Sequence, residues 1–99
     1  MNFKELANKV SQCGRKIIVS AIVNVGESGV QIESIRVGKV ELISVPAKGD
    51  VLVFSNLEIN GCPINACITI MESDVQSIGE IDGKMVVLVE TGAYYISLE

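Results

Sequence analysis

The sequence predicts a mainly β domain, in which one N-terminal amphipathic helix packs on an antiparallel meander of about eight short strands. Valine and isoleucine supply 27 of the 99 residues, and β-branched side chains favour strands. Glycines and turn dipeptides recur at short intervals after Lys16, which is typical of consecutive hairpins. Short connections make sequential strands neighbours, so the sheet must curl into a small barrel or a sandwich, and meander connectivity favours the barrel.

The length of the chain predicts a single domain over residues 1–99, with the helix at 2–13 and the meander at 16–98. Phe3, Leu6 and Val10 recur at helical spacing and form one apolar stripe. Asn2 precedes Glu5 by three positions, a spacing that predicts an N-terminal cap. Gly14 stands where a glycine would end the helix.

The remaining chain divides into strands wherever a turn sequence interrupts an apolar run. Asn60-Gly61 and Asp82-Gly83 predict two-residue hairpin turns, and Gly38-Lys39 fits a two-residue turn with glycine first. The expected strands are residues 16–25, 30–37, 40–45, 51–59, 62–71, 75–81, 84–90 and 93–98.

Turn positions and apolar alternation together predict which residues face each other. In four of the expected hairpins, the partners are Val25 with Val30, Val37 with Val40, Ile59 with Cys62, and Ile78 with Val87. The pairing that starts at Ile59 is expected to continue without a slip to Val51 opposite Ile70. Apolar parity changes near Ser34, which predicts a β-bulge there.

The composition excludes several classes of function. The chain has no histidine and therefore no imidazole base or ligand, and no Gly-rich phosphate loop opens a helix. A net charge of −4 with only 4% aromatic residues disfavours nucleic-acid binding. No apolar run is long enough to span a bilayer as a helix. We therefore expect no enzyme activity, no cofactor, no metal, no nucleic-acid partner and no membrane partner.

The cysteine count indicates a reducing compartment. Cys13, Cys62 and Cys67 make an odd number, whereas a small secreted scaffold normally has an even set. If residues 62–71 form one strand, Cys62 and Cys67 point to opposite faces and do not bridge each other. The expectation is three free thiols in a cytoplasmic protein.

Charge is distributed unevenly along the chain. Residues 1–50 carry a net +2, and residues 51–99 carry a net −6, with Lys84 as their only cation. Turn carboxylates of this kind are ordinary solvated groups, or they contact a partner protein with a basic surface. The contact residues expected in the second case are Glu58, Glu72, Asp74, Glu80 and Asp82, joined by Tyr94 or Tyr95.

Some strands are apolar on both faces, notably residues 17–19, 52–54 and 85–89. Either the helix and the curvature of the sheet cover the second face, or that face associates with another copy of the chain. The candidate self-association residues are Ile18, Leu52, Phe54, Val86 and Leu88.

Three hypotheses for function follow. The first is a non-enzymatic interaction module that binds and inhibits or regulates a larger protein. Small acidic proteins of this general kind occur among immunity proteins and phage or mobile-element inhibitors, although no motif of this sequence carries that analogy. The second is a structural subunit of a symmetric homo-oligomer, such as a virion, tail or ring assembly. The third is a carrier of small apolar ligands.

Overall fold

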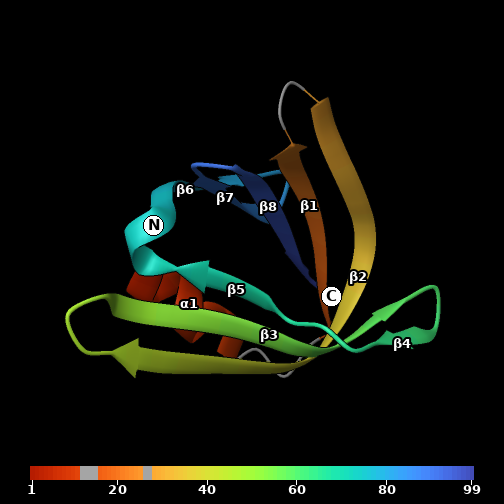
Figure 1. Ribbon diagram of the computed structural model, residues 1–99, viewed down its shortest axis with the longest axis horizontal. Coiled ribbons are helices and arrows are strands. Elements are labelled where there is room, and N and C mark those ends of the chain that lie inside the picture. The colour runs from red at the N-terminus through yellow and green to blue at the C-terminus, as the bar shows by residue number, and fades with distance from the viewer. Residues whose placement is uncertain (12–15, 26–27) are drawn as a thin grey trace.

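The computed structural model describes residues 1–11, 16–25 and 28–99, and only the backbone at positions 24, 25 and 33. It confirms a mainly antiparallel β fold with one N-terminal helix (Figure 1). The elements are α1 (Phe3–Ser11), β1 (Ile17–Val25), β2 (Ser28–Val45), β3 (Gly49–Ile59), β4 (Cys62–Ile64), β5 (Ile68–Met71), the 3-10 turn η1 (Glu72–Asp74), β6 (Val75–Ile81), β7 (Lys84–Val89) and β8 (Gly92–Leu98).

The predicted cap starts α1. The Asn2 side-chain Oδ1 accepts a hydrogen bond from the Glu5 backbone N–H at 2.8 Å. The apolar stripe is buried at Phe3, Leu6 and Val10, so the helix contributes one face to the core. The expected end of the helix, including Cys13 and Gly14, lies outside the described residues.

The strands form one eight-stranded sheet in the order β4-β3-β2-β1-β8-β7-β6, and β5 also pairs with β3. The sheet folds into two layers. The first half of β2 lies with β1, β8, β7 and β6, while its second half lies with β3 and β5 (Figure 1). The sheet does not close, because no pairing among the described residues joins β6 to β4 or β5. The barrel favoured by the sequence is therefore an open, two-layered arrangement.

The prediction of a hairpin at Gly38-Lys39 is wrong, because β2 continues through these two residues as one 18-residue strand. Val37 faces Leu57 and Val40 faces Phe54, so they do not pair with each other. Gly38 lies against β3 at this point. A Cβ on Gly38 would lie 2.8 Å from the Asn56 Cβ and 2.9 Å from the Asn56 carbonyl oxygen. The glycine thus permits a close approach between two strands and does not form a turn.

The Asn60-Gly61 hairpin forms as predicted, with positive φ at both residues and Ile59 opposite Cys62. The single strand expected at 62–71 is instead divided into β4 and β5. Pairing slips by one residue between them, so Val51 faces Met71 and not Ile70. The slip arises because residues 65–67 leave the ladder between the two short strands.

The β1–β2 hairpin is tighter than the sequence predicts. Val23 pairs with Val30, and Val25 pairs with Ser28, so the expected Val25–Val30 pair is displaced by two positions. The bulge predicted at Ser34 is present. The register of β1 and β2 changes between Val19 and Ala21, and Ser34 has a φ of 57°. At the Asp82-Gly83 turn, Ile78 faces Val87 as predicted.

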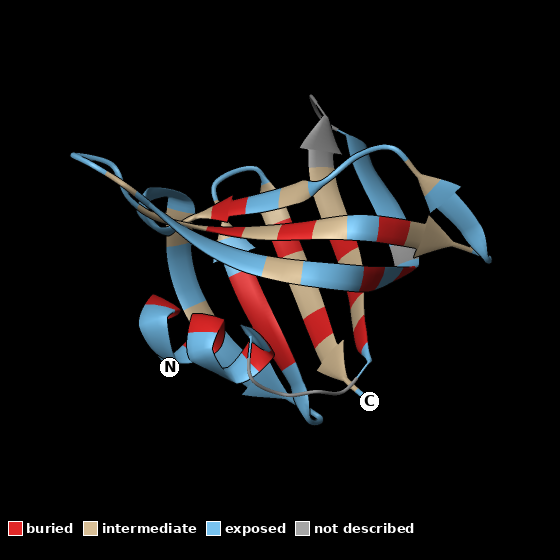
Figure 2. Cartoon of the chain, turned by 90° about the horizontal axis from the view of Figure 1, so that it is seen from below, coloured by how far each residue is buried: buried red, intermediate tan, exposed pale blue. Residues whose placement is uncertain are grey.

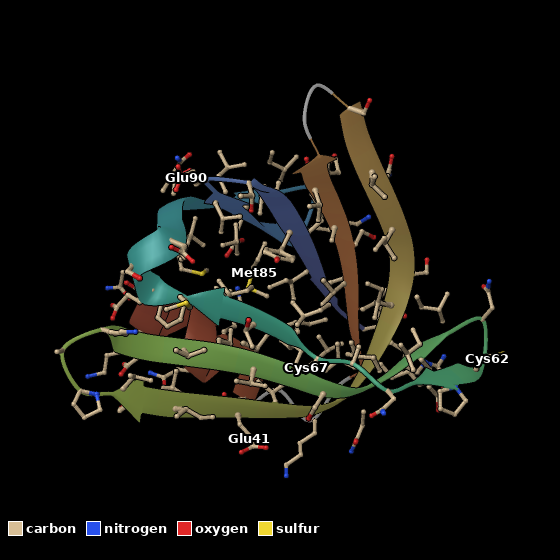
Figure 3. All side chains as sticks on the ribbon, viewed as in Figure 1. Glu41, Cys62, Cys67, Met85 and Glu90 are labelled. Atoms are coloured by element: carbon tan, nitrogen blue, oxygen red, sulfur yellow. The ribbon has the colours of Figure 1, made fainter. Side chains whose placement is uncertain are left out.

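The core lies between the two layers, and α1 packs against one end of it. Figure 2 shows buried bands crossing the strands of both layers, with the buried face of the helix turned toward them. Met85 lies in this interior in Figure 3 and is 2% exposed. The largest fully buried side chains are Phe54, Leu6, Leu52, Ile70, Ile96, Val10, Val19 and Val87.

Candidate functional site

A hollow of about 200 Å³ opens where η1 meets the turn between β7 and β8. We call it the η1 hollow. Its polar lining residues include Asp74, Glu90 and Tyr94. The full lining is Thr69, Ile70, Met71, Asp74, Val89, Glu90, Thr91 and Tyr94. The lining therefore brings two acidic residues together with two threonines, three apolar residues and one tyrosine.

Two stretches of the chain that are distant in sequence, residues 69–74 and 89–94, form this hollow. β5 pairs with β3 in one layer, and η1 leads from its end toward β6 in the other layer (Figure 1). Glu90 and Thr91 form the two-residue turn that joins the Val89–Gly92 pair. Tyr94 follows on β8 with its side chain packed against the core. Each carboxylate thus stands on a short connection, and the ring stands on a paired strand.

The electrostatic setting of Tyr94 favours its neutral form. Burial raises the pKa of the Tyr94 hydroxyl above its ordinary value of 10.0, and the negative charge of Asp74 raises it further. Both effects act in the same direction because each disfavours a phenolate. At neutral pH the η1 hollow therefore presents a protonated phenol beside a carboxylate.

The carboxylate of Glu72 makes a structural hydrogen bond next to the η1 hollow. Its Oε1 accepts a hydrogen bond from the Asp50 backbone N–H at 3.3 Å. The Asp50 Oδ1 in turn accepts one from the Ser44 hydroxyl at 2.9 Å. This contact fastens η1 to the start of β3, so Glu72 positions the segment that carries Asp74.

The other candidate acidic residues are dispersed. Glu80 pairs with Lys9 of α1 at 3.0 Å, and Asp82 occupies the β6–β7 turn with a φ of 52°. Glu58 pairs in register with Arg36 and borders a second hollow of about 330 Å³, which Ile18 and Asn60 also line. Of the acidic residues named from the sequence, the structure places Asp74 together with Tyr94, and Glu72 beside them.

Glu90 is the acidic residue at this site that the sequence reasoning missed. The apolar pattern predicts it as the last residue of a strand over 84–90, whereas it begins the β7–β8 turn. The available signal was the two-residue spacing between Val89 and Gly92, which is typical of a tight hairpin. Thr69 and Thr91 gave no signal, because their place in the η1 hollow depends on how the two layers meet.

The two tyrosines lie on opposite faces of β8. Tyr94 faces the core side, while Tyr95 lies in the same cross-strand row as Ser20 and Val86. Both are half-buried. Tyr95 therefore belongs to a different surface from the η1 hollow.

The candidate self-association residues likewise fall into two groups, some in the core and some nearer the surface. Leu52 and Phe54 are 0% exposed and lie in the core, so neither can contribute to a surface. Both lie on β3 and point toward the opposite layer, which covers them. Val86 is buried outside the core cluster, Ile18 is half-buried, and Leu88 is 42% exposed.

The thiols and other potential ligands form no further site among the described residues. Cys62 and Cys67 are free and exposed, and Figure 3 shows them at separate positions along the chain. Cys13 lies outside the described residues. Within the described part of the chain, no group of three or more carboxylates or thiols is placed to hold a metal ion. No helix in the described ranges has the length and apolar character needed to cross a bilayer.

Comparison of the chain with protein-family models, with curated proteins and with solved structures finds no match.

The raised pKa of Tyr94 leads to a prediction about alkaline pH. In a Tyr95→Phe variant, Tyr94 is the only tyrosine, and its phenolate absorbance should appear above pH 10.0. An additional Asp74→Asn substitution should lower this midpoint only in part, because burial is the larger cause. A midpoint at or below that of a free tyrosine would contradict the burial of this ring.

The same shift has a consequence for stability. As pH rises, the unfolded chain loses the Tyr94 proton before the folded chain does. The contribution of the protonated Tyr94 to the free energy of unfolding is therefore complete below pH 10.0 and is lost above it. Denaturant unfolding should show a steeper alkaline loss of stability in the native sequence than in Tyr94→Phe. Equal slopes in the two proteins would contradict this prediction.

Proposed function

We propose that this protein is a small interaction module that binds a basic segment of a larger partner protein and so inhibits or regulates it. The η1 hollow is the observation that carries the proposal. The acidic lining residues Asp74 and Glu90 suit the cationic head of an arginine or lysine, and the apolar residues beside them suit part of the aliphatic stem. The Tyr94 ring adds a face on which a guanidinium can stack.

The charge of the chain supports a basic partner. The net charge is −4, and residues 51–99 contribute seven acidic residues against Lys84 alone. A negative field of this kind accelerates association with a cationic surface, and salt screens that effect. The free, exposed thiols of Cys62 and Cys67 agree with a reducing compartment, so we place the protein in the cytoplasm.

The proposal is tested by titrating the labelled protein with a blocked Gly-Arg-Gly peptide and following amide shifts by NMR. The matched probe is Gly-Gln-Gly, which keeps the length and removes the charge. We expect saturable shifts at Thr69, Asp74 and Thr91 with the arginine peptide, with a Kd on the order of millimolar for so small a ligand. Equal shifts with both peptides would overturn the proposal.

Two glutamate variants make the test specific. Glu90→Gln removes a carboxylate from the η1 hollow, and we expect it to weaken binding of the arginine peptide about threefold to tenfold. Glu41→Gln removes the same charge from a half-exposed side chain that pairs with Lys39 at 3.1 Å on the other layer (Figure 3). This control should bind like the native protein. Equal weakening by both variants would mean that only net charge matters.

A further inference from the structure

The second hollow, of about 330 Å³, lies where β1, β2 and the β3–β4 turn meet (Figure 1). We call it the Arg36 hollow. It shares no lining residue with the η1 hollow. Ligand pockets have volumes of about 300–1,000 Å³, so this one suits a small molecule. The full lining is Ile18, Ser34, Arg36, Glu58, Asn60 and Gly61.

Three neighbouring strands place an apolar, a cationic and an anionic residue in one row of this hollow. Ile18 of β1 faces Arg36 of β2, and Arg36 in turn faces Glu58 of β3. Side chains that face each other across a sheet emerge on the same side of it, with Cβ atoms about 4.5–5.5 Å apart. The Arg36 hollow therefore presents opposite charges on adjacent strands, next to an aliphatic side chain.

Left-handed backbone shapes the rim of the hollow beside this row. Ser34 has a φ of 57° at the bulge of β2, and Asn60 and Gly61 have φ values of 53° and 77° in the hairpin turn. Bulges bend a strand and change the direction of its side chains. The bulge and the turn thus interrupt the regular surface of the sheet on both sides of the charged pair.

The two charged side chains are available to a ligand. Within the described residues, neither Arg36 nor Glu58 takes part in an ion pair, although they face each other in the ladder. Arg36 is exposed and Glu58 is half-buried. The guanidinium and the carboxylate therefore start from neighbouring positions without neutralising each other, and a ligand that carries both charges can bridge them.

We propose that the Arg36 hollow binds a free α-amino acid with an aliphatic side chain. The planar guanidinium of Arg36 suits the ligand carboxylate, to which it can donate two parallel hydrogen bonds. The Glu58 carboxylate accepts hydrogen bonds from the ammonium group on the same α-carbon. Ile18 contacts the aliphatic side chain, so each substituent of the α-carbon has one partner in the row.

The pair of charges selects this ligand over simpler ions. An anion without an ammonium group would be repelled by Glu58, and a cation without a carboxylate would be repelled by Arg36. The η1 hollow differs because its charged lining residues are both acidic, which favours cations. The two hollows are therefore expected to bind different classes of ligand, and this proposal does not depend on the one made for the η1 hollow.

Three small molecules with one aliphatic skeleton test the proposal on the native protein. L-leucine carries both charged groups, 4-methylpentanoate lacks the ammonium group, and 3-methylbutylamine lacks the carboxylate. With leucine we expect saturable NMR shifts of the backbone amides of Ser34, Arg36 and Gly61, with a Kd on the order of millimolar. Each analogue should bind at least about tenfold more weakly, because a charged hydrogen bond is lost.

A pair of variants on β2 makes the test specific. Arg36→Gln should weaken leucine binding at least about tenfold, and the same spectra report whether it is folded. Lys39→Gln is the matched control, because Lys39 is also an exposed cation of β2 but pairs with Glu41 outside the hollow. It should leave the Kd for leucine unchanged.

Four results would overturn the amino-acid site. They are no saturable shift with leucine, equal binding of leucine and either analogue, equal weakening by the two variants, and leucine shifts confined to the residues of the η1 hollow. The series of small molecules uses the native protein, so it decides the proposal even if a variant fails to fold.

Discussion

Phe54→Ala should remove about 3–5 kcal/mol from the free energy of unfolding, because it leaves a cavity at the centre of the core. Phe54 is 0% exposed and faces Val40 across β3 and β2. The total stability of a domain of this size is about 5–15 kcal/mol, so this one substitution brings the protein near unfolding. Urea denaturation measures the loss as a lower midpoint with an unchanged slope.

Val53→Ala is the control on the same strand. Val53 points to the opposite face of β3 and is half-buried, so its truncation should cost about 1 kcal/mol. The pair of variants also tests the role first expected for Phe54 as a self-association residue. A Phe54→Ala protein that kept its stability but changed its state of association would contradict the structure.

Gly92→Ala should be the second strongly destabilising change, with a loss of about 3 kcal/mol. A Cβ at position 92 would overlap the carbonyl oxygen of Ile22 and lie 2.9 Å from its carbon. The obstacle is backbone, which cannot rotate away as a side chain can. The β1–β8 ladder would have to separate at the Val23–Gly92 pair.

Gly79→Ala is the matched control for this glycine. Gly79 also lies in a strand, its φ is not positive, and no heavy atom lies within 4 Å of an added Cβ. Its replacement should change stability by less than about 1 kcal/mol, since it also reduces the freedom of the unfolded chain. Thermal unfolding of both variants tests this difference. Similar melting temperatures would show that the close approach of residue 92 to the Ile22 backbone does not make Gly92→Ala destabilising.

The sequence predicted those parts of the fold in which local turn chemistry and apolar alternation agree. Asn60-Gly61 and Asp82-Gly83 each require positive φ at two residues, and both hairpins formed in the expected register at the turn. Asn2 likewise acts within a single helical turn. These features depend on residues close together in the chain, which is why sequence reasoning found them.

Features that depend on contacts between distant segments were not predictable in this way. Gly38 looks like a turn residue, but a glycine is needed at this position because Asn56 on another strand leaves no room for a Cβ. Leu52 and Phe54 lie on β3 and are buried because the opposite layer covers them, which no pattern within 52–54 reveals. The same holds for the candidate site. Asp74 was named from its charge, but its neighbours Tyr94 and Glu90 come from the opposite layer.

The position of β1 between β2 and β8 determines how the molecule can fold. The β1–β2 ladder joins neighbours in sequence, whereas the β1–β8 ladder pairs Ile17 with Leu98 across most of the chain. Forming contacts between such distant residues costs the entropy of closing a long loop before the contacts stabilise the fold. Folding should therefore take milliseconds to seconds. During synthesis, one edge of β1 stays unpaired until β8 has also been made.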